Sequence, residues 1–251
     1  MKRALFASAA MALSVTASAA SLDEVLTCNF ETMGGLENIK AVESARMTGT
    51  MSMGPMQAPF TIEFQKPNSV RMEFEIQGMT AVQAYDGENG WAIMPFMGKT
   101  TPEAMVEDEL KSIQEMAEWE GPFIDWEEKG HSVELVGVED IEGTEAHVIK
   151  VVRAGSEDET TYYLDTEYCL TFLTKGVQDI QGNKMAMSQS IGDYKEVGDI
   201  VMAHSMIGTI GDGPGAMQQA LTVESVELNV DDITEARFAM PATEEMPEEA
   251  N

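Results

Sequence analysis

Basic residues are scarce in this sequence of 251 residues, which has 15 lysines and arginines against 44 aspartates and glutamates. The formal net charge is −29. Binding to nucleic acid and to anionic lipid headgroups depends on Lys and Arg side chains, so an acidic surface of this kind repels both. The composition therefore excludes a nucleic-acid-binding function.

Long apolar runs are also missing, except at the N-terminus. There, Lys2 and Arg3 precede an apolar run over 4–15 and a stretch of small residues over 17–19. This order is typical of a secretory signal, and the run is shorter than the roughly 20 residues that span a bilayer. We therefore predict a signal peptide over 1–20, export, and a mature protein that is not an integral membrane protein.

Cysteine occurs only twice, as Cys28 and Cys169. No cysteine directly follows the predicted signal, where Ala20 and Ser21 stand, so we expect no lipid anchor. In an exported chain the even pair permits one disulfide, which would join the N-terminal segment to a middle strand. The other possibility is two separate buried thiols.

Residues for catalysis and metal binding are few. The three histidines, His131, His147 and His204, lie on separate expected strands, and none has a second His or Cys at metal-ligand spacing. No nucleophile elbow, phosphate loop or dinucleotide fingerprint is present. We predict no enzymatic activity, no metal and no cofactor. A hydrolase or isomerase would need polar groups that converge in a pocket, for which Tyr85, Tyr163 and His204 are the candidates.

Alternating apolar and polar side chains dominate the rest of the chain. From Phe60 to Ile76, apolar residues occupy every second position on both sides of a turn at 66–68. Because successive side chains of a strand point to opposite faces, this predicts antiparallel strands with one apolar face. A slip of the apolar phase predicts a bulge at 224–225. Further strands are expected at 44–53, 90–96, 132–138, 145–153, 160–164, 170–178, 184–194, 200–210 and 221–230.

One long helix is expected inside this series of strands. The residues from Thr100 to Glu103 form a helix start signal with proline in the first turn, and Gly121-Pro122 is a stop signal. Apolar residues between them follow helical spacing. We predict that this helix, near 101–120, lies as a lid across the apolar face of an open sheet.

Methionine is frequent, with 20 residues, and many of them fall at inward positions of the expected strands. Methionine is flexible and polarisable, so a wall lined by it adapts to ligands of irregular shape. One helix cannot easily fill a wide curved sheet, and we expect a partly unfilled apolar cavity. The residues expected to line it are Met72, Phe74, Ile76, Trp91, Ile93 and Phe96 from the sheet and Met105, Leu110, Ile113 and Met116 from the helix.

A series of short motifs, spread over the chain, resembles a known family. The motifs are Lys66-Pro67-Asn68, Phe74, Asp86-Gly87 with Trp91, Pro95-Phe96, and Arg237-Phe238 before Met240-Pro241, together with Gly34-Gly35-Leu36-Glu37 and the run over 193–197. In order and spacing they resemble the LolA/LolB lipoprotein-carrier family and the broader group of outer-membrane lipoprotein-sorting proteins. The resemblance implies an unclosed antiparallel β-barrel covered by α-helices that carries the acyl chains of lipoproteins. It also implies a lid latch at Lys66, where the carriers have an arginine.

The sequence thus predicts a mainly β half-barrel domain over 21–238 and an acidic disordered tail over 239–251. We expect a soluble periplasmic carrier that binds an acylated lipoprotein or another lipid for transport toward the outer membrane. The resemblance implies an inner-membrane exporter and an outer-membrane receptor as partners. The alternative is a periplasmic module that senses envelope stress by binding another protein on the same scaffold.

Overall fold

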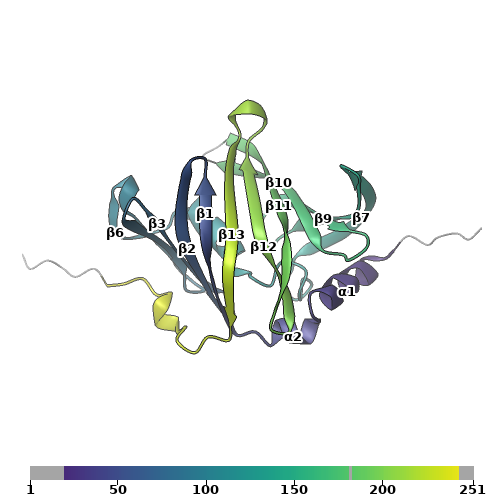
Figure 1. The fold of residues 1–251 in the computed structure, drawn as a ribbon, viewed down its shortest axis with the longest axis horizontal. Coiled ribbons are helices and arrows are strands. Elements are labelled where there is room, and N and C mark those ends of the chain that lie inside the picture. The colour runs from purple at the N-terminus through teal and green to yellow at the C-terminus, as the bar shows by residue number, and fades with distance from the viewer. Residues whose placement is uncertain (1–19, 181–182, 243–251) are drawn as a thin grey trace, which may run out of the picture.

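Strands make up most of the computed structural model, which describes residues 20–180 and 183–242 (Figure 1). The first six strands are β1 (Ser44–Met53), β2 (Met56–Gln65), β3 (Ser69–Ile76), β4 (Met79–Tyr85), β5 (Gly90–Met94) and β6 (Lys99–Ala104). The others are β7 (Ser132–Ile141), β8 (Thr144–Val152), β9 (Glu159–Asp165), β10 (Thr171–Ile180), β11 (Asn183–Val197), β12 (Ile200–Ile210) and β13 (Met217–Leu228).

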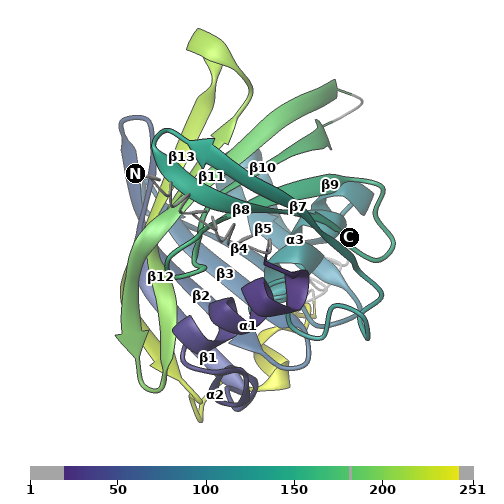
Figure 2. The same cartoon turned by 90° about the vertical axis from the view of Figure 1, so that its right-hand side faces the viewer.

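These strands form one sheet that does not close. Their order is β6-β5-β4-β3-β2-β1-β13-β12-β11-β10-β9-β8-β7, so β6 and β7 are its edges. Neighbouring strands pair antiparallel throughout the described residues. Figure 2 shows the sheet curled around the helices. The predicted mainly β, unclosed antiparallel barrel is confirmed.

Three α-helices lie on the concave side, which we call the inner face; they are α1 (Leu22–Thr32), α2 (Leu36–Lys40) and α3 (Glu107–Ala117). A capping box opens α1, because the Ser21 side chain accepts a hydrogen bond from the Glu24 N–H and the Glu24 carboxylate accepts one from the Ser21 N–H. Val25 and Leu26 of α1 pack with buried residues of β7, β8 and β9. Short 3-10 helices are η1 (Pro95–Met97), η2 (Gly213–Gly215) and η3 (Glu235–Arg237).

The third helix covers the other half of the sheet. Ile113 and Ala117 of α3 belong to the same buried cluster as Met72 of β3 and Tyr85 of β4. Each half of the curled sheet is therefore covered by its own helix, α1 over β7 to β9 and α3 over β3 to β5. The helical lid expected from the sequence is present on the apolar face.

This helix is shorter and begins later than the sequence suggested. Residues 99–104 form β6, in which Ala104 stands opposite Trp91 of β5. The helix begins at Glu107, with three acidic residues in its first turn facing the positive end of the helix dipole. Threonine favours strands, and an edge strand tolerates Pro102 because not every N–H there needs a partner. The expectation of a helix start at 100–103 was wrong.

A disulfide joins Cys28 of α1 to Cys169 in the connection between β9 and β10. Of the two possibilities left open by the sequence, the structure has the cross-link. The neighbouring Asn29 is buried and its amide donates a 2.8 Å hydrogen bond to the Cys169 carbonyl oxygen. The N-terminal helix is thus fixed to the second half of the sheet by a covalent and a polar contact.

The predicted bulge lies at Glu224, where β13 has one residue more than β1. Thr48 stands opposite Ser225 and Gly49 opposite Val223, so Glu224 has no partner in the register. A Cβ atom on Gly49 would lie 2.0 Å from the Thr222 carbonyl oxygen. The bulge therefore needs a residue without a side chain at position 49.

The C-terminal segment lies against the convex side of the sheet, which we call the outer face (Figure 1). Ile233 and Phe238 are buried there, and the Trp91 indole N–H donates a 2.7 Å hydrogen bond to the Phe238 carbonyl oxygen. Glu63 of β2 is only 1% exposed, and it pairs with Arg46 and Arg237. Alternation puts Glu63 on the polar side of β2, and the C-terminal segment buries it there.

Two predicted segments lie largely outside the described residues. The signal peptide over 1–20 is described only at Ala20, and the acidic tail over 239–251 only at 239–242. Within the ranges that the structure describes, no helix is both long enough and apolar enough to span a membrane.

Candidate functional site

The structure brings six of the ten predicted cavity residues together on the inner face. Met72 is buried there in the cluster under α3, and the partly buried Phe74 and Ile76 pack against it. From the helix side, Ile113 belongs to the same cluster, and Met105 and Leu110 pack against it. The alternation of β3 and the helical spacing after 104 both pointed to this surface.

The other four residues have different positions. The ring centroids of Phe96 and Phe74 are 6.0 Å apart, and Phe96 is 39% exposed. Met116 on α3 is also exposed. Trp91 and Ile93 lie in a separate cluster with Val82 and Ala84, on the outer face.

The register explains why Trp91 and Ile93 face outward. Trp91 stands opposite Ala84 and Ile93 opposite Val82, whereas the inner-face residue Tyr85 stands opposite Gly90. Residues opposite one another in a sheet share a face. The expectation that Trp91 and Ile93 line the same surface as Met72 is therefore corrected.

Close packing of α3 on the sheet depends on Gly90. A Cβ atom at this position would lie 2.8 Å from Leu110 Cδ1, 2.8 Å from Met105 Sδ and 3.4 Å from Ile113 Cγ2. The three apolar side chains thus occupy the space that a side chain at position 90 would need. The helix lies directly on the first half of the inner face.

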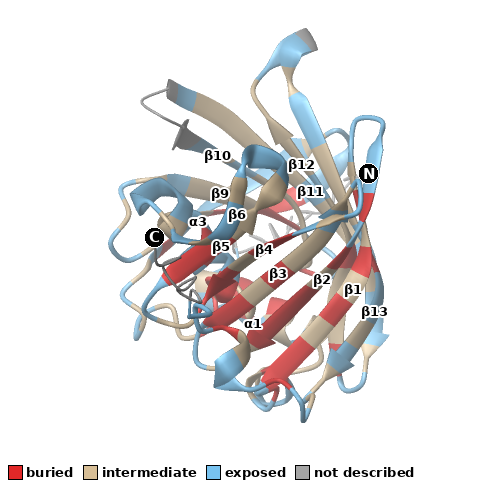
Figure 3. Ribbon diagram, turned by 90° about the vertical axis from the view of Figure 1, so that its left-hand side faces the viewer, coloured by how far each residue is buried: buried red, intermediate tan, exposed pale blue. Residues whose placement is uncertain are grey.

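Beyond the helices, the inner face continues as a half-buried apolar strip. Met206 of β12 stands opposite both Ile191 of β11 and Leu221 of β13. All three side chains are partly exposed, as are Phe74 and Ile76 of β3. We call these five residues the inner trough: Phe74, Ile76, Ile191, Met206 and Leu221. Figure 3 shows the buried residues concentrated in β1 to β5, whereas β12 is mostly of intermediate exposure.

The part of the inner trough that comes from the later strands was not among the expected cavity residues. Ile191, Met206 and Leu221 lie on strands that alternation did predict, but the expected cavity residues all lie between 72 and 116. Their strands are joined to the strand of Phe74 through the pairing of β1 with β13, and this pairing cannot be read from local alternation.

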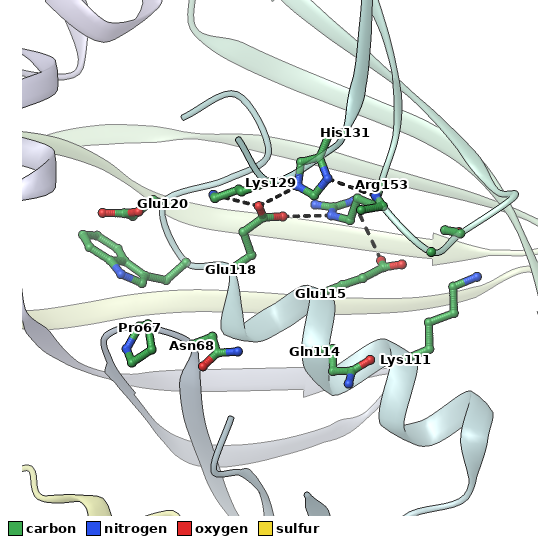
Figure 4. A pocket seen from close by; sticks show the side chains of 14 residues that line it. Pro67, Asn68, Lys111, Gln114, Glu115, Glu118, Glu120, Lys129, His131 and Arg153 are labelled. Carbon is green, nitrogen blue, oxygen red and sulfur yellow. Dashed lines mark hydrogen bonds and ion pairs between the residues drawn. The ribbon is translucent and has the colours of Figure 1, made fainter. Parts of the chain in front are cut away.

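A charged hollow of about 530 Å³ lies beside the C-terminal end of α3 (Figure 4). Glu118 is at its centre: Lys129 Nζ and His131 Nε2 lie 2.8 and 2.9 Å from Glu118 Oε1, and Arg153 Nε lies 3.0 Å from Oε2. His131 Nδ1 also accepts a 3.0 Å hydrogen bond from the Ala154 N–H. These contacts connect the end of α3 to the segments before β7 and after β8.

Electrostatics favour the ionised form of Glu118. Burial alone would raise its pKa, but the hydrogen bonds from Lys129 and His131 and the charge of Lys129 outweigh burial and hold the pKa below its usual value. Burial would lower the pKa of Arg153, but the nearby Tyr162, Glu118 and Glu115 raise it. The cluster is therefore a stable set of opposite charges at neutral pH.

Lys66, the predicted latch, lies next to the chain that follows α3. Its Nζ lies 2.9 Å from Glu120 Oε1 and donates a hydrogen bond to the carbonyl oxygen of Lys40, the last residue of α2. The β2–β3 turn thus contacts the end of α2 and the segment that follows α3. A latch function at this position stays a prediction.

The three polar residues considered for catalysis do not converge. The Tyr85 hydroxyl lies under α3 and donates a 2.7 Å hydrogen bond to the Gly87 carbonyl oxygen. Tyr163 packs with Ala146 and Val148 in a separate cluster. His204 is buried, with Nδ1 3.0 Å from the Met202 carbonyl oxygen. Their positions give no common pocket.

Comparisons with known proteins show the fold. No protein-family model and no curated protein matches the sequence. Among solved structures, the chain is similar to an outer membrane lipoprotein-sorting protein domain from Vibrio parahaemolyticus, with a TM-score of 0.54, 13% identity, and 85% of this chain and 97% of that chain covered.

Two further solved structures have the same architecture. A LolA superfamily protein from Nitrosomonas europaea aligns with a TM-score of 0.58 and 9% identity over 88% of this chain and 98% of its own. A DUF1329 family protein from Desulfovibrio piger aligns with a TM-score of 0.59 and 10% identity over 87% and 97%. The chain thus has the LolA-like fold that its short motifs suggested.

Proposed function

We propose that this LolA-like fold is a soluble periplasmic carrier, which binds the acyl chains of lipoproteins or other lipids on its inner face. The observation that carries the proposal is the inner trough, an apolar strip left partly exposed on the concave side of the sheet. Apolar surface in a concave position favours an apolar ligand, because its burial removes that surface from water.

An acyl chain matches this strip in chemistry. Each methylene that leaves water contributes about 0.8 kcal/mol, so about ten methylenes suffice for useful affinity after the costs of ordering the chain. The trough has no described charged side chain among its five members, and Met206 at its centre can adapt to a bent chain.

Delivery of the ligand needs a second conformation. Since α3 packs on β3 to β5 next to Phe74 and Ile76, its movement would change the size of the trough. A partner that binds the open state more tightly would shift the equilibrium toward release. An inner-membrane exporter and an outer-membrane receptor are the partners that this proposal requires.

The first test is native mass spectrometry, with lipid extraction, on the protein purified from the periplasm. We expect a co-purifying lipid or acylated peptide, and uptake of a fluorescent fatty-acyl probe by the delipidated protein. A protein without ligand that takes up no probe would contradict the proposal.

Substitutions at two adjacent residues test whether the ligand binds to the inner face of the sheet. Met206→Glu places a charge in the inner trough and should weaken binding of the acyl probe about tenfold or more, because a carboxylate in an apolar site must be desolvated. Ile207→Glu, one residue further on the outer face where the side chain is already 41% exposed, is the matched control and should bind normally. Equal binding by both variants would place the ligand elsewhere.

The alternative is an envelope-stress sensor that binds another protein on the same scaffold. The edge strand β7 favours it, because Val136 and Val138 are 51% and 56% exposed next to unpaired backbone. In the same assays, absence of lipid together with capture of one defined periplasmic protein would support this alternative.

A further inference from the structure

Charged side chains are nearly absent from two neighbouring hairpins of this acidic protein. The β1–β2 hairpin has no Asp, Glu, Lys or Arg over 47–62, and the β12–β13 hairpin has only Asp212 over 200–223, although 24% of the whole chain is charged. Since β1 pairs with β13, the two hairpins lie side by side in the sheet. They form one nearly uncharged region in a protein whose formal net charge is −29.

The two hairpins project from the same end of the sheet (Figures 1 and 2). Four apolar side chains are exposed on them, and we call these the hairpin patch: Met53, Met56, Ile207 and Met217, with exposed fractions of 43%, 42%, 41% and 60%. Three of the four, all except Met56, also line a hollow of about 780 Å³ between the hairpins. None of the described residues that line this hollow is charged.

Exposure alone does not distinguish these side chains, because Met97, Met116 and Met240 are exposed as well. Each of those three methionines has a charged residue within three positions of it in the sequence, whereas no member of the hairpin patch has one within four. A charged group must lose its water when the surface around it is buried, which opposes burial of its apolar neighbours. The hairpin patch therefore differs from them in having apolar exposure without charge around it.

We propose that the hairpin patch docks on the surface of a phospholipid bilayer, with its four apolar side chains entering the interface between headgroups and acyl chains. Peripheral binding of this kind grows with the apolar area that enters the bilayer, and charged side chains oppose entry. The anchors of protein–protein interfaces are instead mostly Trp, Tyr and Arg. The segments 47–62 and 200–223 contain none of these three residue types, so their composition fits a lipid surface better than a protein partner.

The position of the hairpin patch suits the transfer of an acyl chain, a step that rests on the proposed carrier function. Side chains four positions apart in a strand share a face, so Met217 lies on the same face of β13 as Leu221 of the inner trough. Met53 lies on the same face of β1 as Met51, which stands opposite Leu221. The inner face of these two strands thus leads from the trough to the hairpin patch.

The test is co-sedimentation of the delipidated protein, purified from the periplasm, with phosphatidylcholine vesicles. This lipid has no net charge and does not repel an acidic protein, so we expect the bound fraction to rise with lipid concentration. The double variant Met53→Glu, Met217→Glu should lower the partition coefficient about tenfold or more, because two carboxylates would have to be desolvated at the interface.

The matched control adds the same two charges at other exposed methionines, by Met97→Glu and Met240→Glu, where the side chains are 69% and 43% exposed. This variant should bind the vesicles as the wild type does. Both double variants should keep the wild-type circular dichroism spectrum, because surface substitutions have small effects on stability. The proposal is overturned if the wild type does not bind the vesicles, or if the two double variants bind them equally.

The docking proposal and the carrier proposal fail in different measurements. Vesicle binding by a protein that takes up no fatty-acyl probe would contradict the carrier function and support docking. Uptake of the probe by a protein that does not bind vesicles would contradict docking and support the carrier function.

Discussion

Glu118 is the residue on which the position of the α3 end depends. Its carboxylate accepts hydrogen bonds from Lys129 and Arg153 and lies 2.9 Å from His131 Nε2. The acid is largely buried, so loss of its charge would remove the carboxylate partner of Lys129 and one of the two carboxylate partners of Arg153. At neutral pH we expect Glu118→Gln to lower the free energy of unfolding by about 1–3 kcal/mol, measured by urea denaturation.

The stability difference between wild type and Glu118→Gln should depend on pH, with a sign that follows from the lowered pKa of Glu118. Because the folded protein lowers the pKa of Glu118, the ionised form contributes stability above the unfolded pKa of about 4.3, and this is lost as the pH falls through the folded pKa. The stability difference between wild type and Glu118→Gln should therefore shrink below about pH 4. A difference that is the same at pH 7 and pH 3.5 would contradict this. Glu159→Gln breaks the exposed pair with Lys150 and should have no measurable effect.

A substitution at Gly49 tests the steric explanation of the bulge. Gly49→Ala would place a Cβ atom 2.0 Å from the Thr222 carbonyl oxygen, which belongs to the backbone and cannot rotate away. We expect a loss of about 2–4 kcal/mol in unfolding free energy or a failure to fold, because β1 and β13 must separate locally. Gly192→Ala in β11 is the control, since nothing lies within 4 Å of a Cβ atom there. Equal stability of both variants would refute the steric explanation.

Single residues also mark where prediction from sequence stops. Alternation correctly placed Met72 and Phe74 on one face, because that rule is local. It could not assign Trp91, whose indole bonds to Phe238, 147 residues further along the chain. Glu63 is buried for the same reason, since Arg237 of the C-terminal segment covers it. Which face a distant segment will cover is a tertiary property that no local pattern contains.

Among the elements, α1 depends most on a covalent link. The disulfide to Cys169 spans 141 residues of sequence, so reduction releases a long loop in the unfolded chain. We expect the double variant Cys28→Ala, Cys169→Ala to lose about 2–5 kcal/mol, as measured by guanidinium denaturation without reductant. Addition of reductant to the wild type should reproduce the loss and should not affect the variant. Equal stability of oxidised wild type and variant would show that the packing of Val25 and Leu26 and the Asn29 hydrogen bond hold the helix without the disulfide.

Element boundaries were predictable only where local signals agreed. The spans of β1 and β12 correspond to the predicted ones, because apolar alternation and turn residues coincide there. At 99–104 the signals conflicted, since Thr100 and Thr101 suit both a helix start and a strand. Pairing with β5 decided the outcome in favour of β6, as it satisfies backbone groups along the edge of the sheet.

At the level of the whole molecule, the curled sheet was predictable and the trough was predictable only in part. Most strands, their apolar faces and one covering helix follow from periodicity, but β4 and β6 were not among the expected strands, and the unclosed barrel was implied by the family resemblance. The trough needs β1 beside β13, a pairing that joins the two halves of the chain. That pairing decides which side chains of the later strands share the inner face with Phe74.

The excess of negative charge gives a prediction for the entire protein. With 44 acids and 15 bases, most carboxylates have no cation nearby, and their mutual repulsion favours expanded states. Salt shortens the screening length from about 30 Å at 10 mM to about 3 Å at 1 M, so repulsion over long distances is lost first. We expect the melting temperature at pH 7 to rise with sodium chloride, although ion pairs such as Arg46–Glu63 are also screened.

Measurements at acidic pH distinguish the screening of carboxylate repulsion from a general effect of salt on buried apolar surface. Near the sequence pI of about 4.2 the net charge approaches zero, so the repulsion disappears while the buried apolar area is unchanged. The rise with sodium chloride, followed by differential scanning calorimetry, should therefore be small at pH 4.2 and large at pH 7. An equal rise at both pH values would assign it to the hydrophobic effect, and a fall at pH 7 would mean that screened ion pairs contribute more to stability than the carboxylate repulsion costs.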